Sequence, residues 1–425
     1  MYIQKMILER FRGAEKLSME LGKQLNLFVG ANGAGKSSVL DAAAILLSWL
    51  VNRIKQTSAS GRPITEPDIK NRESSADIGI TVNEKDRRFS WRLTKSRTRF
   101  RRKKAASVLT EVSDLASQFQ EKISAGEEKA NLPLFAYYPV NRAVLDIPLR
   151  IRQKHRFDLL AAYDESLTSG ANFRTFFEWF RQREDLENEQ RKYVDALFKP
   201  EGFAFPDPQL EAVRRALASF MPDFKNLTVH RNPLRMEVEK NGQPLTVNQL
   251  SDGEKCLMAM VGDIARRMAI ANPNRSNPLE GDGIILIDEI DLHLHPKWQR
   301  MVIQKLLEVF PECQFLISTH SPHVITHVQS DNIFLLSMTD TGLESVQPSE
   351  SYGKTVERIL EDLMGLETTR PVDVENEIRD IYEQIDQGNL DGAKQSIGKL
   401  ETRIGGDSEL VKAAVLIKRK EMIGK

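Results

Sequence analysis

The sequence predicts an α/β fold in which a mixed sheet is wound with helices, interrupted by a mainly helical insertion and followed by a helical C-terminal region. Three observations predict it. A glycine-rich loop at residues 30–35 stands between an apolar strand and an apolar helix. After residue 250, apolar strands alternate with helices, which is typical of a parallel sheet covered by helices. Between these two halves, residues 155–222 are rich in charge and broken by prolines, which indicates an inserted helical segment.

The first half of the predicted fold occupies residues 1–145. Residues 1–29 show strand patterning that ends in the mainly apolar segment 25–29, Leu-Asn-Leu-Phe-Val, which is typical of a buried strand. The other elements expected here are a helix over about 36–51, a loop over 56–77, alternating strands over 77–98 and a buried strand over 134–138.

The remaining domains follow from the same patterning. A mainly helical insertion is expected at 146–230, the second half of the fold at 231–345, and helices suited to partner binding or oligomerisation at 346–425. The elements expected in the second half are a hairpin over 234–245 around Asn241-Gly242, helices from Ser251 and from Pro296, and strands over 283–287 and 314–318.

Composition restricts the class of protein. The chain of 425 residues is long enough for two or three structural units. Its formal net charge is zero, so any affinity for nucleic acid or acidic membranes must be local. Cys256 and Cys313 are isolated and favour two reduced, buried thiols. The longest apolar run, residues 42–51, is far short of the ~20 residues that cross a bilayer. We therefore expect a cytoplasmic protein without a membrane partner.

The glycine-rich loop matches the phosphate-binding motif G-x-x-x-x-G-K-[ST] over residues 30–37. Its backbone amides and the following helix N-terminus suit phosphate oxygens. Lys36 would reach the β- and γ-phosphates, and the hydroxyl of Ser37 would bind Mg²⁺. The sequence therefore predicts ATP and Mg²⁺ as cofactors, with the nucleotide held by Asn32, Gly33, Ala34, Gly35, Lys36, Ser37 and Ser38.

Two adjacent acids end the apolar strand at 284–287. They mark its carboxyl end, the edge where open α/β sheets bind ligands. Asp288 suits the Mg²⁺ role, and Glu289 is placed to orient and deprotonate an attacking water.

A further anion site is expected at the start of the helix after residue 250. Ser251 and Glu254 have the spacing of a capping box, which by itself indicates only a capped helix. A serine hydroxyl, the backbone of Gly253 and a helix N-terminus together also suit an anion.

These motifs, in this order, resemble ABC-type ATPases, whose head is a P-loop fold with a mixed sheet and helices. Residues 250–255, Leu-Ser-Asp-Gly-Glu-Lys, look like the family's signature motif, usually Leu-Ser-Gly-Gly-Gln. Asp252 and Glu254 depart from the transporter form and are close to the RecF- and SMC-like variant. The resemblance implies a homodimer of heads, or a higher homo-oligomer, in which Ser251 and Gly253 bind ATP in trans.

The histidines admit two interpretations. Their spacing, above all at 320, 323 and 327, permits a zinc site. The resemblance favours another role, because residues 315–320 look like the strand that ends in the switch histidine, which contacts the γ-phosphate. Residues 288–296 similarly resemble the Walker B and D-loop segments, which implies that Asp291 lies at the dimer seam and acts in trans. The catalytic residues implied are Glu289 and His320; the histidines considered for zinc are His293, His295, His320, His323 and His327.

One family element has no clear counterpart. No Q-loop glutamine is evident, and residues 138–142, Tyr-Pro-Val-Asn-Arg, occupy its place. The absence of a membrane span disfavours a transporter subunit, and the lack of long heptads disfavours SMC-like arms. No nuclease motif of the Toprim type follows residue 320, so we expect no nuclease activity in cis.

The tail narrows the resemblance. Residues 352–365 and 376–400 look like the region after the head in PtuA-type proteins, the ATPase subunits of Septu antiphage systems and of some retrons. This resemblance implies an ATP-binding and hydrolysing subunit that regulates a separate HNH endonuclease acting on DNA. Two alternatives stay open: a RecF-like DNA repair ATPase without a nuclease partner, and an ATP-sensing scaffold that does not hydrolyse ATP.

A basic segment provides a candidate DNA contact. Residues 85–104 contain eleven Lys or Arg and a single Asp. Such runs are often only solvated faces. Here Phe89, Trp91 and Phe100 would anchor the strands and hold the charges on one surface, giving steeply salt-dependent, sequence-independent binding. The residues expected to contact DNA are Arg97, Arg99, Arg101 and Arg102.

Overall fold

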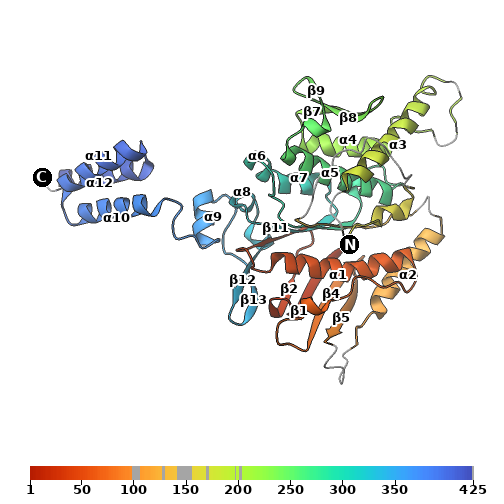
Figure 1. The fold of residues 1–425 in the computed structure, drawn as a ribbon, viewed down its shortest axis with the longest axis horizontal. Helices are drawn as coiled ribbons and strands as arrows, with labels where there is room; N and C mark the ends of the chain where they lie inside the picture. The colour runs from red at the N-terminus through yellow and green to blue at the C-terminus, as the bar shows by residue number, and fades with distance from the viewer. Residues whose placement is uncertain are drawn as a thin grey trace. The chain divides into compact units, whose positions relative to one another are not determined.

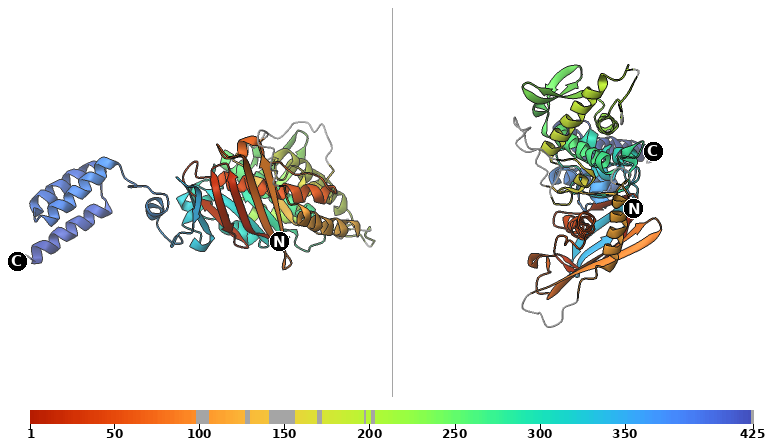
Figure 2. Two further views of the ribbon diagram at one scale, coloured as in Figure 1. Left: turned by 90° about the horizontal axis from the view of Figure 1, so that it is seen from below. Right: turned by 90° about the vertical axis from the view of Figure 1, so that its right-hand side faces the viewer.

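The computed structural model describes residues 1–97, 106–126, 130–140, 156–168, 172–196, 198–200 and 203–423. The chain divides into two compact units, Met1–Lys354 and Thr355–Lys425 (Figures 1 and 2).

A six-stranded sheet forms the centre of the first unit, within the described part of the chain. Its order is β13-β12-β3-β11-β10-β6, and all neighbours are parallel except β12 and β13. The inner strands are buried on both faces, which explains why apolar residues predominate on them. The strands are β3 (Leu25–Val29), β6 (Leu134–Tyr138), β10 (Gly283–Ile287), β11 (Cys313–Thr319), β12 (Ile333–Thr339) and β13 (Gly342–Val346).

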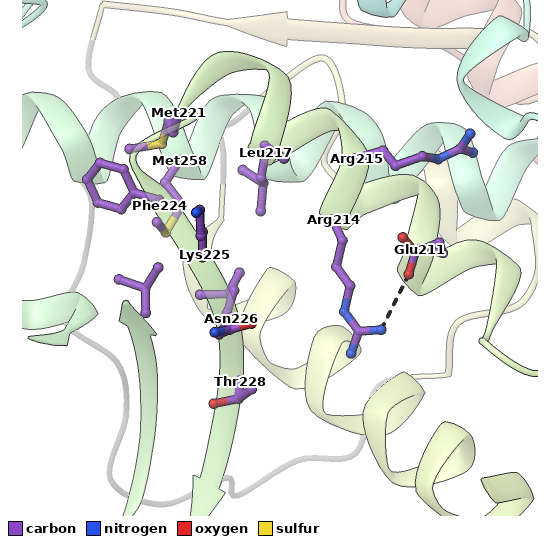
Figure 3. Close-up of a pocket in the computed structure, with 13 residues that line it drawn as sticks. Glu211, Arg214, Arg215, Leu217, Met221, Phe224, Lys225, Asn226, Thr228 and Met258 are labelled. Carbon is purple, nitrogen blue, oxygen red and sulfur yellow. Dashed lines mark ion pairs between the residues drawn. The ribbon is translucent and has the colours of Figure 1, made fainter. Parts of the chain in front are cut away.

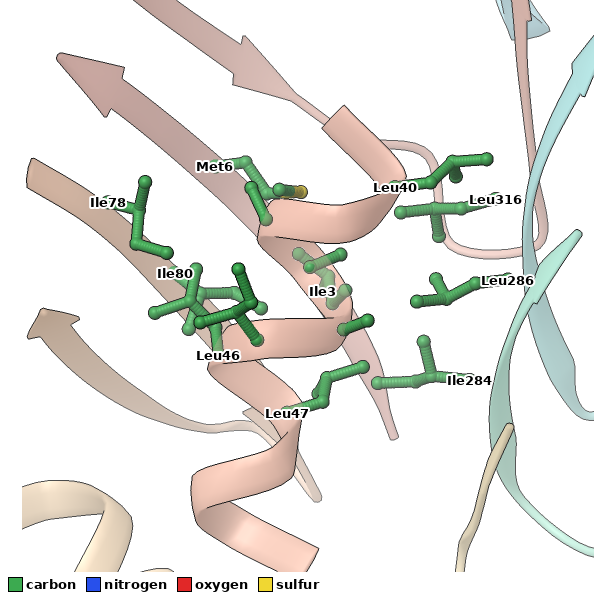
Figure 4. Close-up of a cluster of buried hydrophobic side chains, with 14 of the residues drawn as sticks. Ile3, Met6, Leu40, Leu46, Leu47, Ile78, Ile80, Ile284, Leu286 and Leu316 are labelled. Atoms are coloured by element: carbon green, nitrogen blue, oxygen red, sulfur yellow. The ribbon is translucent and has the colours of Figure 1, made fainter. Parts of the chain in front are cut away.

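An antiparallel sheet of order β2-β1-β4-β5 faces the central sheet across helix α1 (Lys36–Lys55). Figure 4 shows this core: Ile78 and Ile80 approach α1 from one side, and Ile284, Leu286 and Leu316 approach it from the other. Helix α1 is therefore buried along most of its length because both sheets cover it. The strands of this sheet are β1 (Tyr2–Phe11), β2 (Ala14–Glu20), β4 (Ser75–Glu84) and β5 (Arg87–Ser96), and α2 (Thr110–Ser124) packs beside α1 and β5.

Helix α1 is also the one helix among the described residues that is long and apolar enough to cross a membrane by length and composition. Of its apolar window, 67% is buried inside the structure, as in the core helix of a folded domain.

The opposite face of the central sheet is covered by helices of the insertion and of the second half (Figure 1). The longest of these, α5 (Asp252–Ala271), begins at the capping box and is buried over most of its length. Around it lie α3 (Phe173–Arg191), α4 (Pro208–Phe220) and α7 (Val302–Val309), the short helices α6 (Pro296–Gln299) and α8 (Pro322–Ile325), and the antiparallel strands β7 (Phe224–Arg231), β8 (Leu234–Lys240) and β9 (Gln243–Thr246).

The second unit is helical. Its core is an apolar cluster from three helices, which includes Ile381, Ala393 and Ile417. The helices of this unit are α9 (Val356–Asp362), α10 (Val372–Asp386), α11 (Leu390–Ile404) and α12 (Ser408–Ile423).

The predicted α/β fold and its elements are confirmed, with three differences. The helix expected from Pro296 is divided into α6 and α7, because the amide of Met301 bonds back only three residues, to the carbonyl of Trp298. The loop expected over 56–77 contains a short 3-10 turn, and β4 already begins at Ser75. Helix α2 and strands β7, β12 and β13 were not expected.

Candidate functional site

The predicted nucleotide-binding residues come together because of the strand register. Val29 pairs with Thr319, and Ile287 pairs with both Ile317 and Tyr138. The carboxyl ends of β3, β11, β10 and β6 therefore lie along one edge of the sheet. The segments that follow them are the glycine-rich loop, the switch histidine, the paired acids and the beginning of the segment in the Q-loop position.

The glycine-rich loop is held against β12 and β13. A Cβ atom on Gly30, whose φ is +157°, would lie 2.2 Å from the carbonyl oxygen of Leu336. A Cβ atom on Gly35, whose φ is +87°, would lie 2.8 Å from the side chain of Leu343. Both positions therefore require glycine, and the loop takes the strained curvature that turns its amides inward.

The N-terminus of α1 is suited to the phosphate group that the motif implies. No side chain among the described residues caps this helix, and its first turn holds no acidic residue. Its amide N–H groups and partial positive charge are thus available to an anion. Lys36 is buried, and its ammonium group donates to the carbonyls of Gly30 (2.9 Å) and Ala31 (3.0 Å). A bound phosphate would compete with these carbonyls for Lys36.

Charges of both signs meet at this edge of the sheet. Burial lowers the pKa of Lys36, although Asp288, Glu289 and Asp291 act in the opposite direction. Burial, and then the charge of Lys36, lower the pKa of His320 below its ordinary 6.5, again against these three carboxylates. His320 is therefore neutral at neutral pH.

Ser318 organises the paired acids. Its hydroxyl donates to the carboxylate of Asp288 and accepts from the amide of Glu289 at 2.7 Å. Asp288 is almost fully buried. A buried carboxylate beside a hydroxyl-bearing phosphate loop is the donor chemistry that Mg²⁺ prefers, so the residues fit the expected metal.

Glu289 adopts an unusual backbone conformation. Its φ is +48°, in the left-handed region that non-glycine residues rarely occupy. Its carboxylate lies 3.9 Å from Nε2 of His320. A strained backbone held by Ser318 beside a histidine is a feature found at catalytic sites.

Asp291 contacts the switch strand of its own chain. Its carboxylate accepts from the hydroxyl of Thr319 (2.5 Å) and from the amide of His320 (3.4 Å). The side-chain Nε2 of Gln299 donates to the backbone carbonyls of Asp291 (3.4 Å) and Leu294 (2.8 Å). The D-loop and the switch histidine are thus tied together within one protomer.

The capping box predicted at the start of α5 is present. The amide of Ser251 donates to Glu254 Oε2 (2.8 Å), and the amide of Glu254 donates to Ser251 Oγ (3.4 Å). Burial by itself raises the pKa of Glu254, but hydrogen bonds from Lys240 and Ser251 outweigh this effect, so the pKa is lowered. A Cβ atom on Gly253 would lie 2.3 Å from the carbonyl oxygen of His293, so the helix start packs directly on the D-loop.

Behind the sheet, a buried polar cluster joins β6 to α5. The hydroxyl of Tyr138 donates to Asp263 Oδ2 (3.0 Å), which also pairs with Arg266 and Arg267. The amide of Asp288 donates to the carbonyl of Tyr138 (2.8 Å). One strand end therefore contacts both Asp288 and the helix that begins after Ser251. The end of the predicted Q-loop segment, Asn141 and Arg142, lies outside the described residues.

The described residues contain no group of three or more His, Cys, Asp or Glu that could hold a metal ion. His295 instead caps α6 through Nδ1, and His327 hydrogen-bonds to Thr326 and to the carbonyl of His323. Cys313 is buried, as expected, whereas Cys256 is only partly so.

Three of the four residues predicted to contact DNA, Arg99, Arg101 and Arg102, lie outside the described residues. Arg97 donates to the backbone carbonyls of Glu73 (2.9 Å) and Ile69 (3.2 Å). Its guanidinium is thus partly engaged within the chain, and the DNA contact stays a prediction.

Two residues of this site were not foreseen. Ser318 is a polar residue near the end of a strand that is buried on both faces, and its polarity at such a position was a usable signal. Gln299 lies on a short helix, and the sequence carries no signal for its role. Its contacts with Asp291, Leu294 and Ser321 form only when the chain is folded.

Comparisons with known proteins agree with this geometry. Residues 25–326 match the family described as "AAA domain, putative AbiEii toxin, Type IV TA system". The Retron Ec83 probable ATPase of Escherichia coli is 32% identical, covering 89% of this chain and 79% of that protein. The Retron Vc95 probable ATPase of Vibrio cholerae is 33% identical over 78% of this chain and 73% of its own length. Septu protein PtuA of Bacillus thuringiensis is 34% identical over 31% of this chain and 34% of that protein.

Proposed function

This chain belongs to that AAA-domain family and is an ABC-type ATPase related to PtuA, and we propose that it is the ATP-hydrolysing subunit of an antiphage defence complex. In this proposal it regulates a partner HNH endonuclease that acts on DNA. The observation that supports the enzymatic part best is the meeting of Lys36, Glu289 and His320 at one sheet edge.

The proposed roles are assigned as follows. The amides of the glycine-rich loop and Lys36 would bind the phosphates, and Ser37 and Asp288 would hold a Mg²⁺ ion, which would neutralise charge on them. Glu289 accepts a proton from the attacking water, and neutral His320 donates a hydrogen bond toward the γ-phosphate.

The second protomer supplies the rest of the site in this proposal. Ser251 presents its hydroxyl at the N-terminus of a long helix, which suits the γ-phosphate of ATP held by another copy. Because Gly253 packs on His293, a movement of the D-loop would also move this helix start. ATP bound between two heads would thus set the relative position of the signature helix and the D-loop.

The C-terminal unit is the proposed contact for the endonuclease or for further copies. On α12, Val411, Val415 and Met422 are 61%, 59% and 77% exposed. Their spacing of four and seven residues places them on one face of the helix, opposite the face that packs in the unit's core. An exposed apolar stripe of this kind suits helix packing with a partner.

Replacing Glu289 with Gln tests the ATPase mechanism. The variant keeps the shape of the site but removes the base, so hydrolysis should fall by about 10²–10⁴-fold while ATP binding persists. Light scattering with ATP should then show a stable dimer. Glu308→Gln, an exposed carboxylate on α7, is the matched control and should behave as wild type. A Glu289→Gln protein that stays monomeric with ATP and hydrolyses normally would contradict the model.

The partner is tested separately. In this proposal an HNH protein is encoded beside this chain; it should co-purify with the chain, and its cleavage of DNA should differ between wild type and Glu289→Gln. Nuclease activity that is the same with both, or with no ATPase added, would remove regulation from the proposal while leaving the ATPase intact.

A further inference from the structure

A groove of about 510 Å³ lies between α4 and β7, with one wall from α5, and none of its residues belongs to the proposed ATP site (Figure 3). Pockets that bind small molecules measure about 300–1,000 Å³. The volume therefore fits a ligand of modest size.

One end of the groove is apolar. Met221, Phe224 and Met258 gather there, with Leu217 close by (Figure 3). Methionine side chains are flexible and polarisable and pack well against aromatic rings. This end suits a flat ring system.

The rest of the lining carries an excess of positive charge: three cations, Arg214, Arg215 and Lys225, against one carboxylate, Glu211. Arg214 is already engaged by both carboxylate oxygens of Glu187, at 2.9 and 3.0 Å, and Arg215 donates to Asn277 at 3.2 Å. The ammonium group of exposed Lys225 has no ion pair or side-chain hydrogen bond with any described residue. Among the described residues, Arg215 and Lys225 are thus the lining cations without an ion pair, and only Lys225 also lacks a side-chain hydrogen bond.

A peptide strand fits less well than a small molecule. Strand β7 is at the edge of its sheet, where an extended peptide would add by backbone hydrogen bonds. The amide of Val229 on that strand already donates to both carboxylate oxygens of Glu184, at 3.4 and 3.2 Å. Part of this edge is thus occupied by the protein's own side chain.

We propose that this groove binds a small amphipathic anion, with its apolar part over the buried floor that Met221 and Met258 form and its acidic group on Lys225. Met258 lies six residues after Asp252, on the helix that begins at Ser251. A ligand in the groove therefore contacts α5, the helix that presents Ser251. We infer that this ligand changes the affinity of the protein for nucleotide. This last step rests on the proposed function, whereas binding itself does not.

The probe for the test is 8-anilinonaphthalene-1-sulfonate, an aromatic ring system with one sulfonate, titrated by fluorescence into the full chain without nucleotide. Wild type should show a saturable component of one probe per chain. Ala218→Trp, at an exposed position of α4 in the lining, should weaken that component at least about tenfold by filling the groove. Lys225→Glu should weaken it roughly fivefold, and Lys16→Glu, an equal charge change on β2, should leave it unchanged.

Probe binding that is insensitive to Ala218→Trp would overturn the site. The coupling is read in a second titration, of a non-hydrolysable ATP analogue with and without saturating probe. An unchanged analogue affinity would overturn the coupling. Failure of the proposed function would give a different result. The protein would then bind the probe normally but would not bind the ATP analogue, even without the probe.

Discussion

The carbonyl oxygen of His293 lies 2.3 Å from where a Cβ atom of Gly253 would stand. The start of the signature-like helix is thus in backbone contact with the D-loop of the same chain. Only glycine lets the two backbone segments come so close. Gly253 is required because it has no side chain, and not because its backbone takes a conformation that other residues avoid.

Gly253→Ala should therefore lower stability by about 1–3 kcal/mol, because the added methyl group forces the helix start away from His293. Urea denaturation of the full chain measures this effect. Asp252→Ala, one position earlier and highly exposed, should change stability by less than about 1 kcal/mol. Equal stability of the two variants would show that the contact is not tight in solution.

Ser318→Ala should weaken Mg²⁺ use. It removes the donor to Asp288 and the acceptor for the amide of Glu289. Loss of a residue that positions a metal ligand typically costs about 10–100-fold in metal affinity or activity. Hydrolysis measured against Mg²⁺ concentration should show a raised half-saturation point. Ser337→Ala, on β12, is the control; a wild-type Mg²⁺ curve for Ser318→Ala would refute this role.

Lys36→Met should raise the pKa of His320, because the charge of Lys36 helps burial to lower it. Proton NMR of the imidazole measures the shift directly. The direction of the His320 pKa shift, which is downward, also predicts how stability depends on pH. A histidine with a lowered folded-state pKa binds protons more readily when unfolded, so its contribution to stability falls as pH drops through 6.5. An unchanged titration of His320 in Lys36→Met would mean that the two groups are farther apart in solution.

Asp263→Asn should be strongly destabilising. The change leaves Arg266 and Arg267 as buried cations without their carboxylate, and breaking a buried pair in this way costs about 3–5 kcal/mol. Tyr138→Phe removes only one hydrogen bond to the same carboxylate and should cost about 1 kcal/mol. Thermal or chemical unfolding of both proteins would test the expected order, and the reverse order would rule out this account of the cluster.

Much of the site was predictable from the sequence because strand ends and glycine loops have strong local signatures. The motif ending in Lys36 and Ser37, the acids at 288 and 289, and the strand before His320 each carry their own pattern. Their convergence needed only the rule that parallel strands end at one edge. The expectation that Asp291 acts in trans is not tested by a single chain, in which it bonds to Thr319.

What the sequence did not predict depends on long-range contacts. Helix α2 has a buried face of Val112, Leu115, Ala116 and Phe119 at the three- and four-residue spacing of a helix, but its packing against α1 and β5 is visible only in the structure. Strand β7 alternates poorly and carries a bulge between Lys225 and Thr228. The polarity of Ser318 in a buried strand is a local signal, but its hydrogen bond to Asp288, thirty residues earlier, could not be predicted from that signal.

The order of the central sheet also has a consequence for how the protein is made. Strand β3 lies between β11 and β12, which are synthesised almost three hundred residues after it. The phosphate loop thus leaves the ribosome early, yet the carbonyl of Leu336 against which Gly30 packs is translated only near the end of the first unit. During synthesis the chain exposes the apolar β3, and the face of α1 that the central sheet covers, before β11 and β12 are made, so a nascent chain cannot complete the nucleotide site before residue 336 has been added.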